Sequence, residues 1–104
     1  MYEGKNMIEL GGNIILVGFK ELDSSEMIVV KKMIGNYTRK FAERSEKFES
    51  ITLSLKKIHG IEESEKFEIS AKLMDNGKPI NSEETDKNLF FAIDSVLKKI
   101  EKML

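Results

Sequence analysis

Residues 86–104, which read DKNLFFAIDSVLKKIEKML, carry the clearest secondary-structure pattern of the chain. Apolar side chains recur in this stretch at intervals of three and four residues, which is the spacing of one face of an α-helix. These side chains are Leu89, Phe90, Ile93, Val96, Leu97, Ile100 and Leu104. The pattern predicts an amphipathic helix over 86–104, with Thr85 or Asp86 as the N-cap because a side-chain oxygen there can accept from an unpaired first-turn amide. Its apolar face requires a second layer to pack against.

A second amphipathic helix is predicted over residues 24–46. The same spacing relates Met27, Val30, Ile34, Tyr37 and Phe41. Asp23 or Ser24 is a suitable N-cap for this helix. Gly35 lies inside it and costs about 1 kcal/mol relative to alanine, which favours close packing at that position.

The middle of the chain has the alternation of strands with one buried face. Apolar and polar residues alternate over 50–57 and again over 67–74. The sequence Asp75-Asn76-Gly77 then predicts a tight hairpin to a short strand over 78–83, because Asn and Gly tolerate the positive φ of such turns. The β-branched segment 13–19 predicts one more strand before the first helix.

These elements predict an α+β fold, a β-α-β-β-β-α two-layer sandwich with both helices on one face of a four-stranded sheet. An additional N-terminal strand or hairpin precedes it. With 104 residues, the chain suits one domain, which we place at 13–104 after an extension over 1–12. The opposite sheet face is expected to be open and to carry Thr52, Ser54, Lys56, Ser70 and Lys72.

Composition argues against most enzyme chemistry. The chain has no cysteine and one histidine, His59, so it offers neither thiolates nor an imidazole cluster for a metal. The acids Glu62, Glu63 and Glu65 are typical of a solvated loop, and the glycines lack the spacing of a phosphate-binding loop. We therefore expect no enzyme, no cofactor, no metal and no catalytic residue. The sequence contains neither a long apolar run nor a signal peptide, which predicts a cytoplasmic protein without membrane contact.

Charge is distributed unevenly although the net charge is only -1. Residues 24–48 hold six bases and three acids, whereas residues 61–85 hold three bases and seven acids. Such asymmetry can orient a protein on a polyanion, although solvated faces of mixed sign also explain it. Most aromatic residues fall on predicted core faces, with Tyr2, Phe48 and Phe91 as exceptions, so base stacking is not expected as the main mode of recognition. Basic residues on a rigid scaffold favour structured RNA, recognised by its shape.

The C-terminal helix also resembles a known family. Residues 88–94 (NLFFAID), followed by 98–102 (KKIEK) and preceded by Asn76-Gly77-Lys78, are similar to the acidic-hydrophobic-aromatic-x-Ala-Ile-Asp signature and the later Lys-Leu-Glu-Arg pattern of the ribosome-hibernation and ribosome-associated inhibitor proteins. The resemblance implies the β-α-β-β-β-α fold and binding to the small ribosomal subunit, where tRNA and mRNA pass, with translation blocked during stress.

In that family, basic residues on both helices contact ribosomal RNA. By position, Lys99 and Lys102 match the two basic sites of the second helix and Arg39 matches one of the first. Lys32, Lys40 and Lys98 are neighbours of these sites rather than matches, and we expect all six residues to bind RNA. Near-neutral charge, about twelve extra N-terminal residues and an end at Leu104 without a basic tail or second domain favour a short, divergent member, such as an archaeal one.

A second class of function is open on the residues alone. The polar sheet face, or an edge strand, suits a protein-interaction module or a homodimer that does not bind RNA. Weak net charge favours this alternative.

Overall fold

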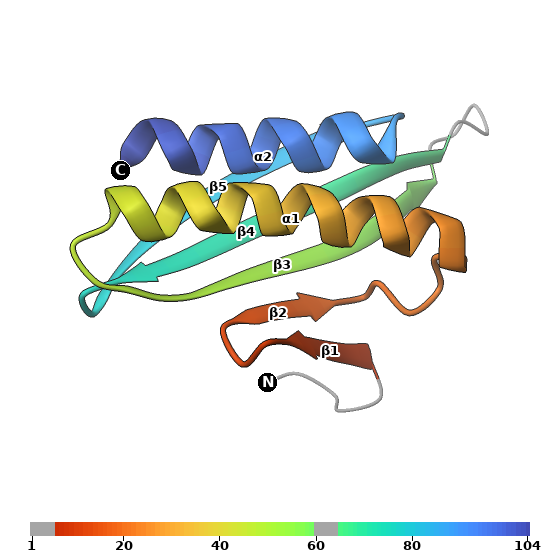
Figure 1. Cartoon of the computed structure of the whole chain (residues 1–104). Coiled ribbons are helices and arrows are strands. Elements are labelled where there is room, and N and C mark those ends of the chain that lie inside the picture. Colours follow the sequence, from red (N-terminus) through yellow and green to blue (C-terminus); the bar gives the residue numbers. More distant parts are fainter. Residues whose placement is uncertain (1–5, 60–64) are drawn as a thin grey trace.

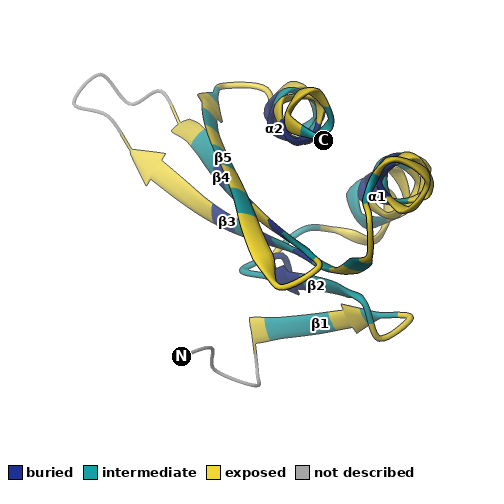
Figure 2. Cartoon of the chain, turned by 90° about the vertical axis from the view of Figure 1, so that its left-hand side faces the viewer, coloured by how far each residue is buried: buried dark blue, intermediate teal, exposed yellow. Residues whose placement is uncertain are grey.

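The computed structural model describes residues 6–59 and 65–104, and shows two layers (Figure 1). Its elements in chain order are β1 (Met7–Leu10), β2 (Ile14–Val17), α1 (Ser24–Arg44), β3 (Phe48–His59), β4 (Glu65–Asp75), β5 (Lys78–Asp86) and α2 (Leu89–Met103). Both helices cover the same face of the sheet, with their buried residues turned toward it (Figure 2). The prediction of an α+β fold with both helices on one side is confirmed.

The strands form one open, mixed sheet in the order β1-β2-β3-β4-β5. β2 and β3 pair in parallel, and the other neighbours pair antiparallel. A parallel pair needs a crossover connection, and α1 supplies it between β2 and β3. The long β3–β4–β5 meander then returns the chain to α2, which lies beside α1 (Figure 1).

The predicted number of strands is wrong, because the sheet has five strands rather than four. Residues 7–10 and 14–17 form a hairpin that continues the sheet, with Met7 opposite Val17 and Leu10 opposite Ile14. Ile8, Leu10 and Ile14 pack against the core. This burial explains why the N-terminal hairpin joins the sheet as its edge instead of standing apart from it.

The core lies between the helices and the sheet, on the faces that the alternation predicts. From β3 and β4, Ile51, Leu53, Ile69 and Leu73 are fully buried. The buried residues of the helices are Val30, Ile34, Tyr37 and Phe41 of α1 and Leu89, Ala92, Ile93, Val96, Leu97 and Ile100 of α2. One continuous core therefore fixes both helices against the sheet.

The predicted N-cap residue is confirmed for α1 but not for α2. Asp23 caps α1 as expected, since its Oδ1 accepts the Glu26 N–H at 2.8 Å while Glu26 Oε1 accepts the Asp23 N–H at 3.1 Å. The cap predicted for α2 at Thr85 or Asp86 is wrong. The structure places both in β5, and Asn88 Oδ1 accepts the Phe91 N–H at 2.9 Å instead.

The other boundaries shift by a few residues. α1 ends at Arg44 rather than 46, because the chain turns there to meet the β4–β5 hairpin, where the Lys47 N–H donates to Asp75 Oδ1 at 2.8 Å. The predicted tight turn is confirmed by positive φ at Asn76 and Gly77. The prediction of close packing at Gly35 is wrong, because Gly35 is exposed and a Cβ there would meet no described atom within 4 Å.

Candidate nucleic-acid interface

The outer surface of the two helices is built on two contacts between them. The Tyr37 hydroxyl of α1 donates to Asp94 Oδ1 of α2 at 2.7 Å. Seven residues further along both helices, Arg44 Nη2 lies 3.7 Å from Glu101 Oε2. Because both pairs advance together along the chain, the helices are parallel and meet about every two turns. The surface therefore has a fixed register from one helix to the other.

Asp94 is the centre of this contact. Burial, followed by the hydrogen bond to Asp94, raises the pKa of Tyr37 far above its ordinary value of 10.0, so the phenol remains a donor at any physiological pH. The other carboxylate oxygen of Asp94 lies 3.6 Å from Lys98 Nζ, one turn further along α2. Asp94, the last residue of the signature, therefore joins the helices and is compensated by a lysine.

Positive charge is concentrated on these helices. Together α1 and α2 carry eight Lys or Arg residues against four Asp or Glu, a net +4. Since the whole chain is -1, the remaining residues carry -5. A near-neutral protein thus has a distinctly basic helix layer and an acidic remainder, which is the asymmetry that can orient it on a polyanion.

On α1 the structure places three of the predicted RNA-binding residues in solvent. Lys32 and Arg39 are exposed and stand seven positions apart, so they occupy one helix face about 10 Å apart along the axis. This face is opposite the buried stripe. Lys40 lies closer to α2, with its Nζ 5.2 Å from the centroid of the Tyr37 ring, a cation–π distance.

On α2 the three predicted lysines divide into two groups. Lys98 and Lys102 are exposed and one turn apart on the outer face. Lys99 is directed toward β5 instead, where its Nζ lies 2.9 Å from Glu84 Oε2 and donates to the Glu83 carbonyl oxygen at 2.9 Å. The Lys99 ammonium, followed by the Ser95 hydroxyl, lowers the pKa of Glu84. Five of the predicted residues thus lie on the surface of the helix layer: Lys32, Arg39, Lys40, Lys98 and Lys102. The Lys99 ammonium is instead bound to β5.

Two basic residues of the helices, Lys31 and Arg44, were not among the predicted sites. Arg44 has a side chain 55% exposed and bridges to α2 through Glu101. Its position four residues after Lys40, on the same side of α1, was a signal available in the sequence. The Tyr37–Asp94 bond had no such signal, because its partners are 57 residues apart.

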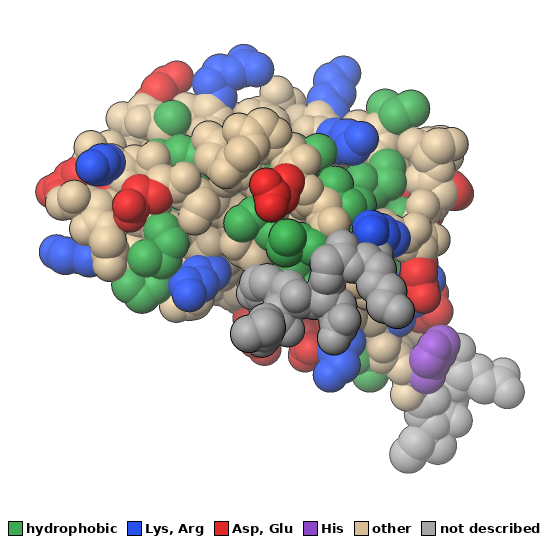
Figure 3. Space-filling model, turned by 90° about the horizontal axis from the view of Figure 1, so that it is seen from below, with side chains coloured by type: hydrophobic (Ala, Val, Ile, Leu, Met, Phe, Trp, Pro, Cys, Tyr) green, Lys and Arg blue, Asp and Glu red, His purple; other side chains and the backbone are tan. Residues whose placement is uncertain are grey.

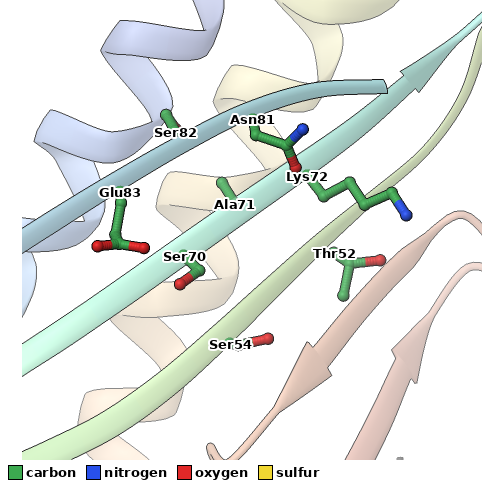
Figure 4. A pocket seen from close by; sticks show the side chains of 8 residues that line it. All are labelled: Thr52, Ser54, Ser70, Ala71, Lys72, Asn81, Ser82 and Glu83. Atoms are coloured by element: carbon green, nitrogen blue, oxygen red, sulfur yellow. The ribbon is translucent and has the colours of Figure 1, made fainter. Parts of the chain in front are cut away.

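The remaining described surface shows mixed chemistry. The sheet face away from the helices is hollowed to about 240 Å³ and is lined by Thr52, Ser54, Ser70, Ala71, Lys72, Asn81, Ser82 and Glu83 (Figure 4). At the β1 edge, acidic, basic and hydrophobic side chains are interspersed (Figure 3). The helix layer, in contrast, carries a net +4.

Two of the residues considered for metal or acid–base chemistry, His59 and Glu65, lie at the adjoining ends of β3 and β4. His59 Nε2 and Glu65 Oε2 are 3.9 Å apart, and both side chains are exposed. Glu62 and Glu63 lie outside the described residues. Within the described ranges 6–59 and 65–104, no group of three or more His, Cys, Asp or Glu could hold a metal ion. Neither of the two described helices is long and apolar enough to cross a membrane.

The fold and surface are those of a small, two-layer α+β protein whose pair of helices carries a net +4. Comparison with protein families matches residues 24–104 to the family described as sigma 54 modulation protein / S30EA ribosomal protein. The chain belongs to this family of ribosome-associated modulation factors, and the match covers α1 to α2. A search of curated proteins finds no match.

Proposed function

We propose that the protein is a hibernation factor that binds the small ribosomal subunit through the outer surface of α1 and α2 and inhibits translation. The observation that carries the proposal is the net +4 on the two helices of a chain that is otherwise acidic, in a member of a ribosome-associated family. The proposed partner is ribosomal RNA, and the proposed site of action is the cytoplasm.

The geometry suits recognition of an RNA backbone. Phosphate contacts need Lys and Arg on a rigid scaffold, whereas base-specific reading needs further planar donors. Here the scaffold is rigid because the core and the Tyr37–Asp94 bond hold the helices in register. α1, with 21 residues, is about 31 Å long, so the surface can contact several phosphates at once.

Near-neutral net charge makes this binding local and salt-sensitive. With -1 overall, the chain gains little long-range attraction to RNA. Affinity must come from the helix surface itself, and exposed charges separated by more than about 10 Å are screened at 0.1 M salt. We therefore expect tight binding at low ionic strength and a steep loss as salt rises.

Co-sedimentation on sucrose gradients tests the proposal. Purified protein should migrate with small ribosomal subunits at about 50 mM salt and dissociate toward about 200 mM, the range over which phosphate-dominated complexes weaken most visibly. It should not migrate with isolated large subunits. Absence from small subunits at low salt would refute the proposal.

The same preparation tests the alternative of a protein-interaction module. Light scattering during size exclusion gives the mass of the free protein. A stable dimer, together with complexes that survive ribonuclease, would favour interaction through the open sheet face. A monomer that loses its particles after ribonuclease digestion favours RNA as the partner.

A further inference from the structure

One aromatic side chain on the helix layer has no role in the core. Phe91 is 59% exposed and lies in the first turn of α2. The other aromatic side chains in the described parts of the chain are buried or partly buried: Phe19, Tyr37, Phe41, Phe48, Phe67 and Phe90. Phe91 also occupies the variable position of the signature, between Phe90 and Ala92.

The fold does not require a ring at this position. The local contact is made by the backbone, where the Phe91 N–H donates to Asn88 Oδ1. Burying a phenylalanine contributes about 1.5–3 kcal/mol, and most of this is forgone at a residue more than half exposed. Stability therefore does not explain an aromatic side chain here.

The surroundings of Phe91 are those of the proposed RNA surface. Lys98 and Lys102 follow it by seven and eleven positions, so all three share the outer face of α2. The nearby carboxylate, Asp94, is bound to Tyr37 and compensated by Lys98. An exposed ring thus lies in line with two lysines about 10 and 16 Å away along the axis.

We infer that Phe91 stacks on one unpaired base of the RNA that the helix layer binds. Unpaired bases in RNA loops and bulges present flat faces that aromatic side chains cover, while neighbouring lysines hold the backbone. The inference rests on the proposed function and deepens it: the ligand is structured RNA with a splayed base beside its phosphates, rather than a regular duplex alone.

Substitutions at Phe91 separate stacking from general hydrophobic contact. Phe91→Ala should weaken binding to small subunits about 5- to 150-fold, the range for losing one base–aromatic stack. Phe91→Tyr and Phe91→Trp should retain binding, and Phe91→Leu should lose it. The control is Ile58→Ala, an exposed apolar residue of β3 on the open sheet face, which should bind as the wild type does.

The salt dependence adds a second readout. Stacking neutralises no phosphate, so the Phe91 variants should shift log K equally at every salt concentration and leave its slope against log[salt] unchanged. Equal thermal midpoints for wild type and Phe91→Ala would establish that the loss of affinity is not a loss of folding.

Cross-linking identifies the occupant directly. Benzoylphenylalanine at position 91, irradiated on the small subunit, should attach the protein to RNA at an unpaired nucleotide. Attachment to a ribosomal protein, or full binding by Phe91→Leu or Phe91→Ala, would overturn the inference while leaving the proposed function intact. Failure of the wild type to bind would overturn both.

Discussion

Replacing Tyr37 by phenylalanine removes the hydroxyl that joins the helices and leaves the buried ring in place. A hydrogen bond to a charged group contributes about 1.5–3 kcal/mol. Asp94 has a side chain 42% exposed and keeps Lys98, so water can replace the lost donor and the cost falls to about 1–2 kcal/mol. Urea unfolding at pH 7 should show this loss for Tyr37→Phe. In a double-mutant cycle with Asp94→Ala, the two changes should be non-additive by a similar amount.

The stabilisation by the Tyr37 hydroxyl should also depend on pH, and the raised pKa sets the direction of that dependence. Folding raises the pKa of Tyr37, so the folded state retains a proton that the unfolded chain releases above its ordinary pKa of about 10. The stabilisation is complete below pH 10 and decreases above it, by at most about 1.4 kcal/mol per pH unit. The gap between wild type and Tyr37→Phe should therefore be constant from pH 7 to 9 and should narrow between pH 10 and 11. A gap below about 0.3 kcal/mol, or one that does not change above pH 10, would show that the Tyr37–Asp94 hydrogen bond does not stabilise the fold.

Three further substitutions test other parts of the fold. Gly35→Ala should stabilise the protein by about 0.4–1 kcal/mol in urea unfolding, since the site is exposed and open to a Cβ; destabilisation would show a contact that the structure lacks. Gly18→Ala should destabilise it by about 1–3 kcal/mol or more, because φ is +83° and a Cβ would clash with the Leu55 carbonyl oxygen; an unchanged melting temperature would contradict that clash. Glu84→Gln removes a carboxylate whose pKa is lowered, so the wild type should be more stable at pH 7 and the difference should shrink as pH falls below about 4.3, the ordinary glutamate pKa; a difference that stays constant on acidification would contradict the Lys99–Glu84 pair.

The parts of the fold that could be predicted are those in which burial dictates the residue pattern. In both helices the apolar residues recur every three to four positions, and in β3 and β4 they recur at every second position, because each element buries one face in the common core. β5 was predicted to end at 83, yet it continues to Asp86. Ile80 packs against the core. The next residues facing the helices, Ser82 and Glu84, are polar and bond to α2: Ser82 Oγ donates to the Val96 carbonyl oxygen at 2.8 Å, and Glu84 Oε2 accepts from the Ser95 hydroxyl at 2.8 Å. A strand that pairs in this way has no hydrophobic alternation to detect.

In the candidate site, too, some features could be predicted from the sequence and others could not. Exposure of Lys32, Arg39 and Lys102 follows from their places opposite the apolar stripes, and the helical period was sufficient to predict it. The engagement of Lys99 with Glu84 depends on how α2 lies over β5, which no local pattern reports. The fifth strand likewise depends on tertiary pairing, because a short hairpin can either extend a sheet or stand alone.

The salt dependence of binding to small ribosomal subunits tests whether α1 and α2 form the RNA-binding surface. The two variants to compare each lose three exposed basic residues: Lys32, Arg39 and Lys102 changed to Ala on the helix layer, and Lys56, Lys66 and Lys72 changed to Ala on the open sheet face. At about 0.7–0.9 units per phosphate contact, the helix variant should flatten the slope of log K against log[salt] by about 2 to 3 units, and the sheet variant should keep the wild-type slope. An unchanged slope in the helix variant, or an equal change in the sheet variant, would contradict the assignment of RNA binding to α1 and α2.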